Sequence, residues 1–141
     1  LKNTSIYYDE VKANYSLYSK APIIEYDRKD WKASACSEMT SSNGDGPAAS
    51  AIDGNENSWW HTNYIGEDQH EGNHCISIEF GKEISFDSVN VVSRGKGSNG
   101  TIKKYKLEAK INGEWTTVKE GEFTDGKNDK IELEESIKSS G

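Results

Sequence analysis

The chain has 141 residues, and its 24 acidic and 17 basic side chains give it a formal charge of −7 at pH 7. Hydrophobic residues make up 33% of the chain, which suits one core in a single domain, and no apolar run approaches the roughly 20 residues that span a bilayer. The acidic balance argues against nucleic acid or an anionic membrane as the main partner, since both attract faces rich in lysine and arginine.

The first 30 residues differ from the rest of the chain. They hold five of the seven tyrosines and few aliphatic residues, and their periodicity predicts one face of a short helix made by Tyr7, Val11, Tyr15 and Tyr18. We interpret residues 1–30 as a linker or the edge of a preceding domain, and residues 31–141 as one domain. The chain does not begin with Met, so we expect it to be a piece of a longer, processed protein.

From Trp31 onward, apolar and polar residues alternate, as half-buried antiparallel strands require. The clearest run is 101–111, and shorter runs lie at 76–80, 84–91 and 130–134. The alternation slips at Asp87-Ser88, where we predict a bulge or bend, and Asn112-Gly113 predicts a tight hairpin. Short strands separated by turns at intervals of about 8–12 residues predict an all-β fold, namely an antiparallel β-sandwich or jelly roll.

The long segment Ser37–Asn73 breaks this rhythm and is rich in Ser, Asn, Gly and Asp. A compact domain rarely carries such a long irregular region unless that region has a function, so we expect the functional site here. Within it, the adjacent Trp59 and Trp60 are expected to point to opposite faces, one into the core and the other beside a site. His61 follows them directly; a lone histidine is more often an ordinary surface residue than a ligand-binding one.

Two polar clusters have a spacing that suits ligand binding. Asp53, Asn55 and Ser58 can wrap a hard cation such as Ca²⁺ together with main-chain carbonyls, although the spacing lacks the terminal glutamate of an EF-hand. A polar turn without metal explains this spacing equally well. Arg94 and Asn99 flank the loop between two predicted strands, and their donors and acceptors suit the vicinal hydroxyls of a sugar.

Cys36 and Cys75 belong to no C-x-x-C pair, so zinc and redox motifs have no support. One disulfide and two buried, unpaired thiols are equally compatible with the sequence. No motif for an enzyme is present either. A small glycosidase would need Glu38, Asp53 or Glu67 as acid and base, and an apolar setting singles out no two carboxylates for that task.

The strings W-K-A-S-A-C-S-E, G-P-A-A-S-A-I-D-G-N-E-N-S-W-W-H-T, H-C-I-S-I-E-F-G-K and N-G-T-I-K-K-Y-K-L-E-A resemble the discoidin or coagulation-factor C-type β-sandwich. Within it they are most similar to the family-32 carbohydrate-binding modules of secreted bacterial glycosidases and other mucin-targeting enzymes. The resemblance covers about Trp31 to Leu133. It implies a structural calcium held by Ala51, Asp53, Asn55 and Ser58, and a sugar site made by Glu38, His61, Arg94 and Asn99, to which we add Tyr64.

The resemblance implies a non-catalytic module that recognises terminal galactose, N-acetylgalactosamine or N-acetylglucosamine and targets an attached, secreted bacterial enzyme to glycans. Two departures matter. The final strand of such modules, which carries a stacking aromatic and a metal-binding glutamate, is not found before Gly141, and their usual tryptophan before I-S-I is Cys75 here. Two alternatives stay open: a discoidin-type adhesion module that binds protein or phospholipid, and a structural spacer without a working site.

Overall fold

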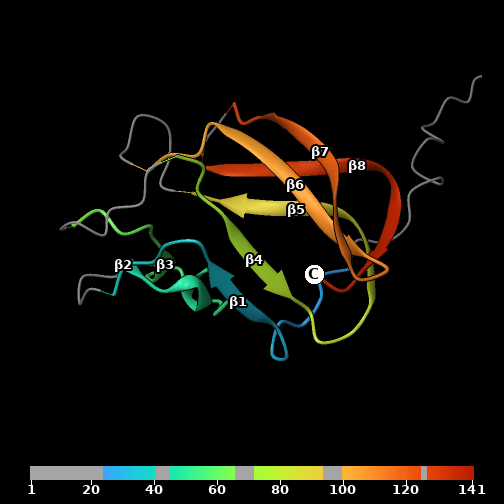
Figure 1. Ribbon diagram of the computed structural model, residues 1–141, viewed down its shortest axis with the longest axis horizontal. Coiled ribbons are helices and arrows are strands. Elements are labelled where there is room, and N and C mark those ends of the chain that lie inside the picture. Colours follow the sequence, from blue (N-terminus) through green and yellow to red (C-terminus); the bar gives the residue numbers. More distant parts are fainter. Residues whose placement is uncertain (1–23, 41–44, 66–71, 94–99, 125–126) are drawn as a thin grey trace, which may run out of the picture.

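The computed structural model describes residues 24–40, 45–65, 72–93, 100–124 and 127–141, and within these residues nearly all regular structure is β-strand (Figure 1). The predicted all-β fold is confirmed. The elements are β1 (Lys32–Ala35), β2 (Asp45–Gly46), the short 3₁₀ turn η2 (Ala48–Ala51), β3 (Trp59–Trp60), β4 (Ile76–Glu79), β5 (Ile84–Val92), β6 (Lys104–Ile111), β7 (Glu114–Glu122) and β8 (Asn128–Ser139).

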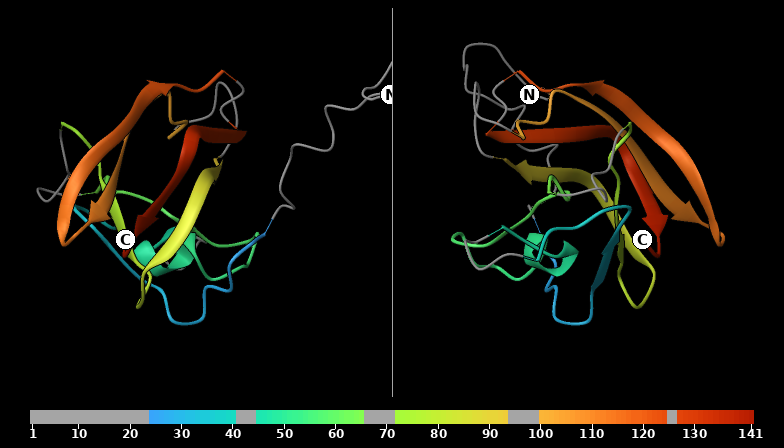
Figure 2. Two further views of the ribbon diagram at one scale, coloured as in Figure 1. Left: turned by 90° about the vertical axis from the view of Figure 1, so that its right-hand side faces the viewer. Right: turned by 60° about the vertical axis from the view of Figure 1, so that its left-hand side comes forward.

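The strands pair two by two. β1 pairs with β4, β5 with β8 and β6 with β7, all antiparallel, whereas β2 and β3 form a short parallel pair. Figure 2 shows the β5–β8 pair facing the β6–β7 hairpin, so the two pairs form opposite layers of a sandwich. The β-sandwich expected from the alternating runs is therefore confirmed.

Two local predictions are also confirmed. The register between β5 and β8 shifts between Phe86 and Ser88, at the position where the alternation of the sequence slips. The β6–β7 hairpin turns at Asn112 and Gly113, with φ angles of 51° and 85°. Positive φ at both central residues is the signature of a type I′ turn, whose twist matches that of the flanking strands.

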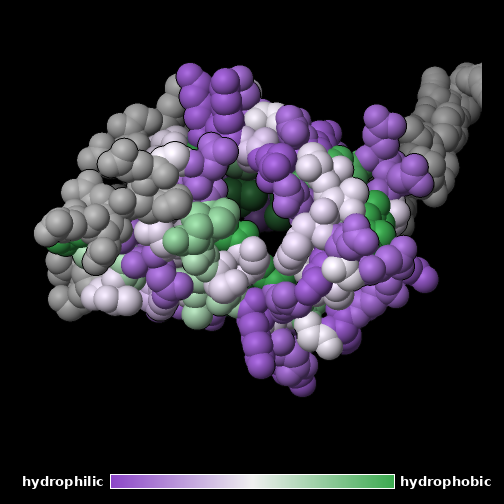
Figure 3. Space-filling view, viewed as in Figure 1, coloured by the Kyte–Doolittle hydropathy of each residue, from purple (hydrophilic) through white to green (hydrophobic). Residues whose placement is uncertain are grey.

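The core between the layers is small. Its buried hydrophobic residues are Ala48, Ile84, Ala109 and Ile131 among the residues described. A ring cluster extends this core, since the Phe80 ring lies 4.9 Å from that of Trp31 and 6.1 Å from that of Phe86. Figure 3 shows apolar side chains at the bottom of a hollow on the face viewed in Figure 1, so the core is open on this side.

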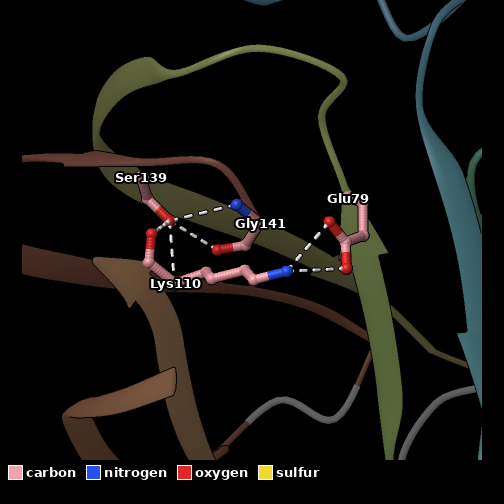
Figure 4. Close-up of polar contacts among 4 residues, drawn as sticks. All are labelled: Glu79, Lys110, Ser139 and Gly141. Carbon is pink, nitrogen blue, oxygen red and sulfur yellow. Dashed lines mark hydrogen bonds and ion pairs between the residues drawn. The ribbon is translucent and has the colours of Figure 1, made fainter. Parts of the chain in front are cut away.

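The end of β8 and the residues that follow it are bonded to β6 and to the end of β4. Ser139 is fully buried, and its Oγ lies 3.0 Å and 3.1 Å from the backbone nitrogen and oxygen of Lys110 in β6 (Figure 4). Ser140 and Gly141 bond to Lys110 as well, and the Phe80 amide, next to β4, donates to the Ser140 carbonyl. The Lys110 ammonium forms an ion pair with Glu79 of β4 at 3.1 Å. These contacts tie the end of β8 to β4 and β6.

The described part of the first 30 residues lies against the sandwich. The Tyr26 hydroxyl donates to the Ser85 carbonyl in β5, and residues 25–29 line a shallow cleft with Ile52 and Asp53. The helical face predicted for residues 7–18 lies outside the described residues, so the division at residue 30 stays a prediction. In the part of the chain that the structure describes, no helix has the length and apolar character needed to cross a membrane.

Candidate functional site

The segment that follows β1 is hydrogen-bonded to the segment that contains β3 and His61. The Met39 amide donates to the His61 carbonyl at 2.7 Å, and the Trp60 indole Nε1 donates to the Ser37 carbonyl at 2.9 Å. The Ser37 hydroxyl accepts from the Asn63 amide at 2.9 Å. Glu38 lies between two of these anchors, and its side chain is exposed. The structure thus places Glu38 and His61 on adjacent, bonded segments.

A close backbone contact holds His61 from its other side. The His61 amide donates to the Gly46 carbonyl at 3.2 Å, which extends the parallel β2–β3 pair by one residue. A Cβ on Gly46 would lie 2.6 Å from the Ser50 Oγ and 3.3 Å from the Trp59 carbonyl oxygen. The absence of a side chain at Gly46 therefore lets β2 approach β3 and η2 this closely.

The His61 imidazole is oriented by its own neighbours. Its Nδ1 lies 2.7 Å from the Thr62 carbonyl oxygen, which can only accept, so Nδ1 carries the proton. In the neutral ring Nε2 is then an acceptor for a hydroxyl or amide proton. The Tyr64 ring packs edge-on against the imidazole at a centroid distance of 4.8 Å, and Tyr64 is 47% exposed. The pair offers one polar acceptor beside one accessible aromatic surface.

The predicted cation turn is closed by hydrogen bonds around Asp53. One carboxylate oxygen accepts from the Asn55 amide at 2.8 Å, and the other accepts from the Ser58 hydroxyl at 2.6 Å. The Ser58 hydroxyl also lies 3.2 Å from the Asn55 carbonyl oxygen. The Ser58 hydrogen bond, followed by the Asn55 amide, lowers the pKa of Asp53 below its ordinary value, and the nearby Arg28 guanidinium adds to this effect.

These oxygens fit a calcium site of low charge. Oxygens of Asp53, Asn55 and Ser58 already converge within hydrogen-bonding distance, and carboxylate, hydroxyl and carbonyl oxygens are the ligands that Ca²⁺ prefers. A cation would displace the hydrogen bond between Ser58 and Asp53, and the Ser58 hydroxyl would keep its proton and bind through an oxygen lone pair. Across the described residues, no group of three or more His, Cys, Asp or Glu side chains is placed to hold a metal, so a site here would combine the Asp53 carboxylate with hydroxyl and main-chain carbonyl oxygens.

The remaining predicted site residues are placed as follows. Arg94 and Asn99 lie outside the described residues. The strands on either side of them are described: β5 ends and β6 begins toward the left-hand side of Figure 1, the side on which β3 lies. Trp59 and Trp60 are both half-buried, so the expectation that one of them fills the core is wrong. The Trp60 indole instead donates a hydrogen bond to the Ser37 carbonyl. The sequence left a disulfide and two buried, unpaired thiols open; in the structure Cys36 and Cys75 are both exposed and no disulfide joins them, so neither alternative is present.

The model of the F5/8 type C domain matches residues 32–140 of this chain, which is most of its length. The chain belongs to this family. Among solved structures, the F5/8 type C domain described here is similar to CpGH89CBM32-5 from Clostridium perfringens, in complex with GalNAc-β-1,3-galactose, at 30% identity and a TM-score of 0.71. That match covers 80% of this chain and 81% of the other.

A second solved structure is the family 32 carbohydrate-binding module of NanJ from C. perfringens, in complex with galactose. It shares 33% identity and a TM-score of 0.69, over 80% of this chain and 79% of that one. These two neighbours identify the F5/8 type C domain as a family-32 carbohydrate-binding module, which is a non-catalytic domain. Among curated proteins, an A type blood N-acetyl-α-D-galactosamine deacetylase from Flavonifractor plautii is 35% identical over 65 residues, and the match covers 46% of this chain and only 8% of that protein.

Sequence reasoning missed two residues on which the site of the F5/8 type C domain depends. Ser37 accepts hydrogen bonds from both Trp60 and Asn63. Gly46 allows β2 to lie close to β3, where its carbonyl accepts from the His61 amide. A serine in a loop rich in serine carries no distinguishing signal. The glycine preceded by Asp45 and followed by Pro47 was a readable turn signal, but its contact with Trp59 depends on tertiary structure.

Proposed function

We propose that this module binds a terminal galactose or N-acetylgalactosamine of a glycan. The proposed site lies at one end of the sandwich and includes Glu38, His61 and Tyr64. The observation that carries the proposal is the His61–Tyr64 pair, in which an oriented imidazole acceptor lies beside an exposed ring. An acceptor of this kind accepts a hydrogen bond from a sugar hydroxyl, and an aromatic edge or face packs against the apolar side of a pyranose.

Arg94 and Asn99 complete the proposed site as donors from the loop between β5 and β6, and Glu38 adds a further acceptor. Each hydrogen bond to a sugar replaces one to water, so its net contribution is about 1 kcal/mol. A few such bonds and one ring predict weak binding, with a Kd on the order of 0.1–1 mM. Binding of this strength becomes useful when several modules or sites act together on a dense glycan surface.

For the turn at residues 51–58 we propose that it binds Ca²⁺ through the Asp53 and Ser58 side chains and the carbonyl oxygens of Ala51 and Asn55. When bound, the ion supplies positive charge that draws these oxygens together. Because Ser58 directly precedes Trp59 in β3, ordering of the turn also orders the strand that leads to His61. Calorimetric titration with calcium, before and after chelation, measures calcium binding. We expect the heat of calcium binding to be absent in Asp53→Asn.

We further propose that the module directs an attached, secreted enzyme to its glycan substrate. The support is the deacetylase relative, of which the chain spans 8%, and the non-catalytic nature of the module itself. Colocalisation of the full-length parent protein with galactose-bearing mucin, and its loss in His61→Ala, tests this proposal.

The decisive experiment is calorimetry of His61→Ala with galactose, N-acetylgalactosamine and glucose. The wild type is expected to bind the first two in the range given above, and His61→Ala is expected to lose binding while its circular dichroism stays unchanged. His74→Ala serves as the matched control, because it removes an exposed histidine outside the His61–Tyr64 pair and should bind as the wild type does. Unchanged affinity in His61→Ala would contradict the proposed site.

One observation favours a second candidate, the binding of phospholipid. Ile65 is 57% exposed beside the exposed Tyr64, which gives the loop end an apolar tip. Membrane-binding tips are normally ringed by basic residues, whereas this chain has a net charge of −7. Sedimentation with phosphatidylserine vesicles, with and without calcium, separates the two candidates: a pellet that is lost in Ile65→Ser would favour the membrane.

A further inference from the structure

The two cysteines lie directly opposite each other where β1 and β4 end their pairing. The last pair of the ladder joins Ala35 to Ile76, and the Cys36 amide continues it by donating to the Cys75 carbonyl at 3.1 Å. Both residues are exposed. Because opposed residues of an antiparallel pair project to the same face, the two side chains leave the ladder on one side, in contact with solvent.

The Cys36 sulfur already rests on the backbone of Cys75. It accepts from the Cys75 amide at 2.7 Å and lies 3.3 Å from the Cys75 carbonyl oxygen. Directly opposed residues of an antiparallel pair have Cα atoms about 4.5–5.5 Å apart, which is within the range that a disulfide spans. The two sulfurs can therefore meet by rotation of side chains, without movement of the strands.

We propose that Cys36 and Cys75 form a reversible disulfide across the end of β1 and β4, by exchange with a low-molecular-weight disulfide such as oxidised glutathione. The Cys36 thiolate attacks one sulfur of glutathione disulfide, which forms a mixed disulfide and releases one glutathione thiolate. The Cys75 thiolate then attacks the Cys36 sulfur and displaces the second glutathione. The two protein thiols are oxidised, the glutathione disulfide is reduced to two thiols, and these take up the two protons that the cysteines lose.

Cys75 suits the second step. The Cys36 thiol beside it, together with partial desolvation, raises the pKa of Cys75, so its thiolate forms less readily than that of an ordinary cysteine. After Cys36 has reacted, Cys75 is held opposite the mixed disulfide by the backbone hydrogen bond from the Cys36 amide to the Cys75 carbonyl. The second step is intramolecular and is therefore favoured over reaction with a second glutathione molecule.

The Cys36–Cys75 disulfide would fix the start of the segment that contributes to the proposed sugar site. Cys36 precedes Ser37, which accepts hydrogen bonds from Trp60 and Asn63, and Met39 bonds to His61. A disulfide between residues 39 positions apart reduces the freedom of the unfolded chain and fixes the start of this segment in the folded one. The structural consequence is a more stable domain, and the consequence for sugar affinity rests on the proposed function.

The test is incubation of the purified protein in glutathione buffers of rising oxidised fraction, followed by intact mass, thiol titration in denaturant and thermal unfolding. The oxidised protein is expected to be lighter by the mass of two hydrogens and to have no titratable thiol. Its Tm is expected to rise on the order of 10 °C. Dithiothreitol should reverse all three changes.

The matched controls are Cys36→Ser and Cys75→Ser, each of which retains one thiol. Each should stop at a mixed disulfide, heavier by one glutathione, with no comparable rise in Tm. The double variant Cys36→Ala/Cys75→Ala should be inert to glutathione, and its reduced-state Tm shows whether the single variants fold normally. Two glutathione adducts on the wild type, or only disulfide-linked dimers, would overturn the proposal.

Galactose calorimetry on the oxidised and reduced forms separates this inference from the proposed function. Preordering the Ser37–Met39 segment is expected to tighten binding about two- to tenfold in the oxidised form. Equal affinity of the two forms would overturn the link to the sugar site. If neither form binds sugar, the proposed function fails, whereas the disulfide is still decided by mass, thiol count and Tm.

Discussion

The sandwich frame and its loop end are built by different means. The frame, made of the β5–β8 and β6–β7 pairs, depends on long ladders and on buried side chains such as Ile84, Ala109 and Ile131. In its described residues, 36–40 and 45–65, the loop end has only short strand pairs, and its position depends on single hydrogen bonds at Ser37, Met39 and Gly46. Stability therefore belongs mainly to the frame, while the proposed binding site belongs to a region that few described contacts define.

This division predicts that stability and binding respond to different substitutions. A cavity in the frame should lower the free energy of unfolding without moving His61. A small backbone displacement in the loop end should weaken sugar binding at little cost in stability. Each prediction below tests one side of this comparison, from the largest expected effect to the smallest.

The frame is tested most severely by Ile131→Ala in β8. Ile131 is 4% exposed and pairs with Val89 of β5, so its truncation leaves a cavity between the layers. We expect a loss of about 2–4 kcal/mol in the free energy of unfolding, measured by urea denaturation. Val92→Ala is the control on the same strand pair, because Val92 is 72% exposed and should change stability little. An equal loss in both variants would contradict the assignment of the core.

The same division explains what the sequence alone could predict. Strand alternation, the bulge near Asp87 and the Asn112-Gly113 turn are local signals of two to ten residues, and the structure has each of them. The loop end has no such periodicity. Its anchors join residues far apart in the chain, such as Ser37 with Trp60 and Gly46 with His61, and nothing in the local sequence of either partner specifies the other.

For the candidate site, the family resemblance supplied His61, and Tyr64 was added from the sequence; the structure places these two rings in contact, and their role in binding stays a prediction. The exposure of both cysteines was not predicted, because hydrophobic character alone favours burial, whereas the β1–β4 register directs these two side chains outward.

The loop end is tested by Gly46→Ala. The added Cβ would meet the Ser50 Oγ at 2.6 Å and the Trp59 carbonyl oxygen at 3.3 Å, so the Ser50 hydroxyl must turn away and β2 and β3 must shift slightly apart. We expect a loss of stability of about 1–2 kcal/mol and a clear weakening of galactose binding, because the Gly46 carbonyl holds the His61 amide. Thermal unfolding and calorimetry measure the two effects.

The matched rescue of this variant is Gly46→Ala/Ser50→Ala, which removes the nearer of the two contacts. Stability and affinity should recover in part, since the contact with the Trp59 carbonyl remains. A double variant that is no better than Gly46→Ala would place the strain on the backbone contact alone. A Gly46→Ala variant that binds as the wild type does would contradict the claim that this approach positions His61.

The smallest expected effect is that of acid pH on the turn that precedes β3, through protonation of Asp53. The pKa of Asp53 lies below its usual value of 3.8 because the ionised carboxylate accepts from Ser58 and Asn55, so the folded turn favours the charged form. A depressed pKa contributes stability that is complete above the unfolded value and is lost as the pH falls through the folded one. Amide shifts of Asn55 and Ser58 followed by NMR should therefore stay constant from neutral pH down to about 5 and move together below 4.

In Asp53→Asn this titration should be absent at every pH, and the remainder of the sandwich should titrate as before. Asn55 and Ser58 shifts that persist unchanged to the acid limit would mean that the carboxylate does not hold the turn. The order of the loop end would then depend on β2 and the Ser37 segment alone.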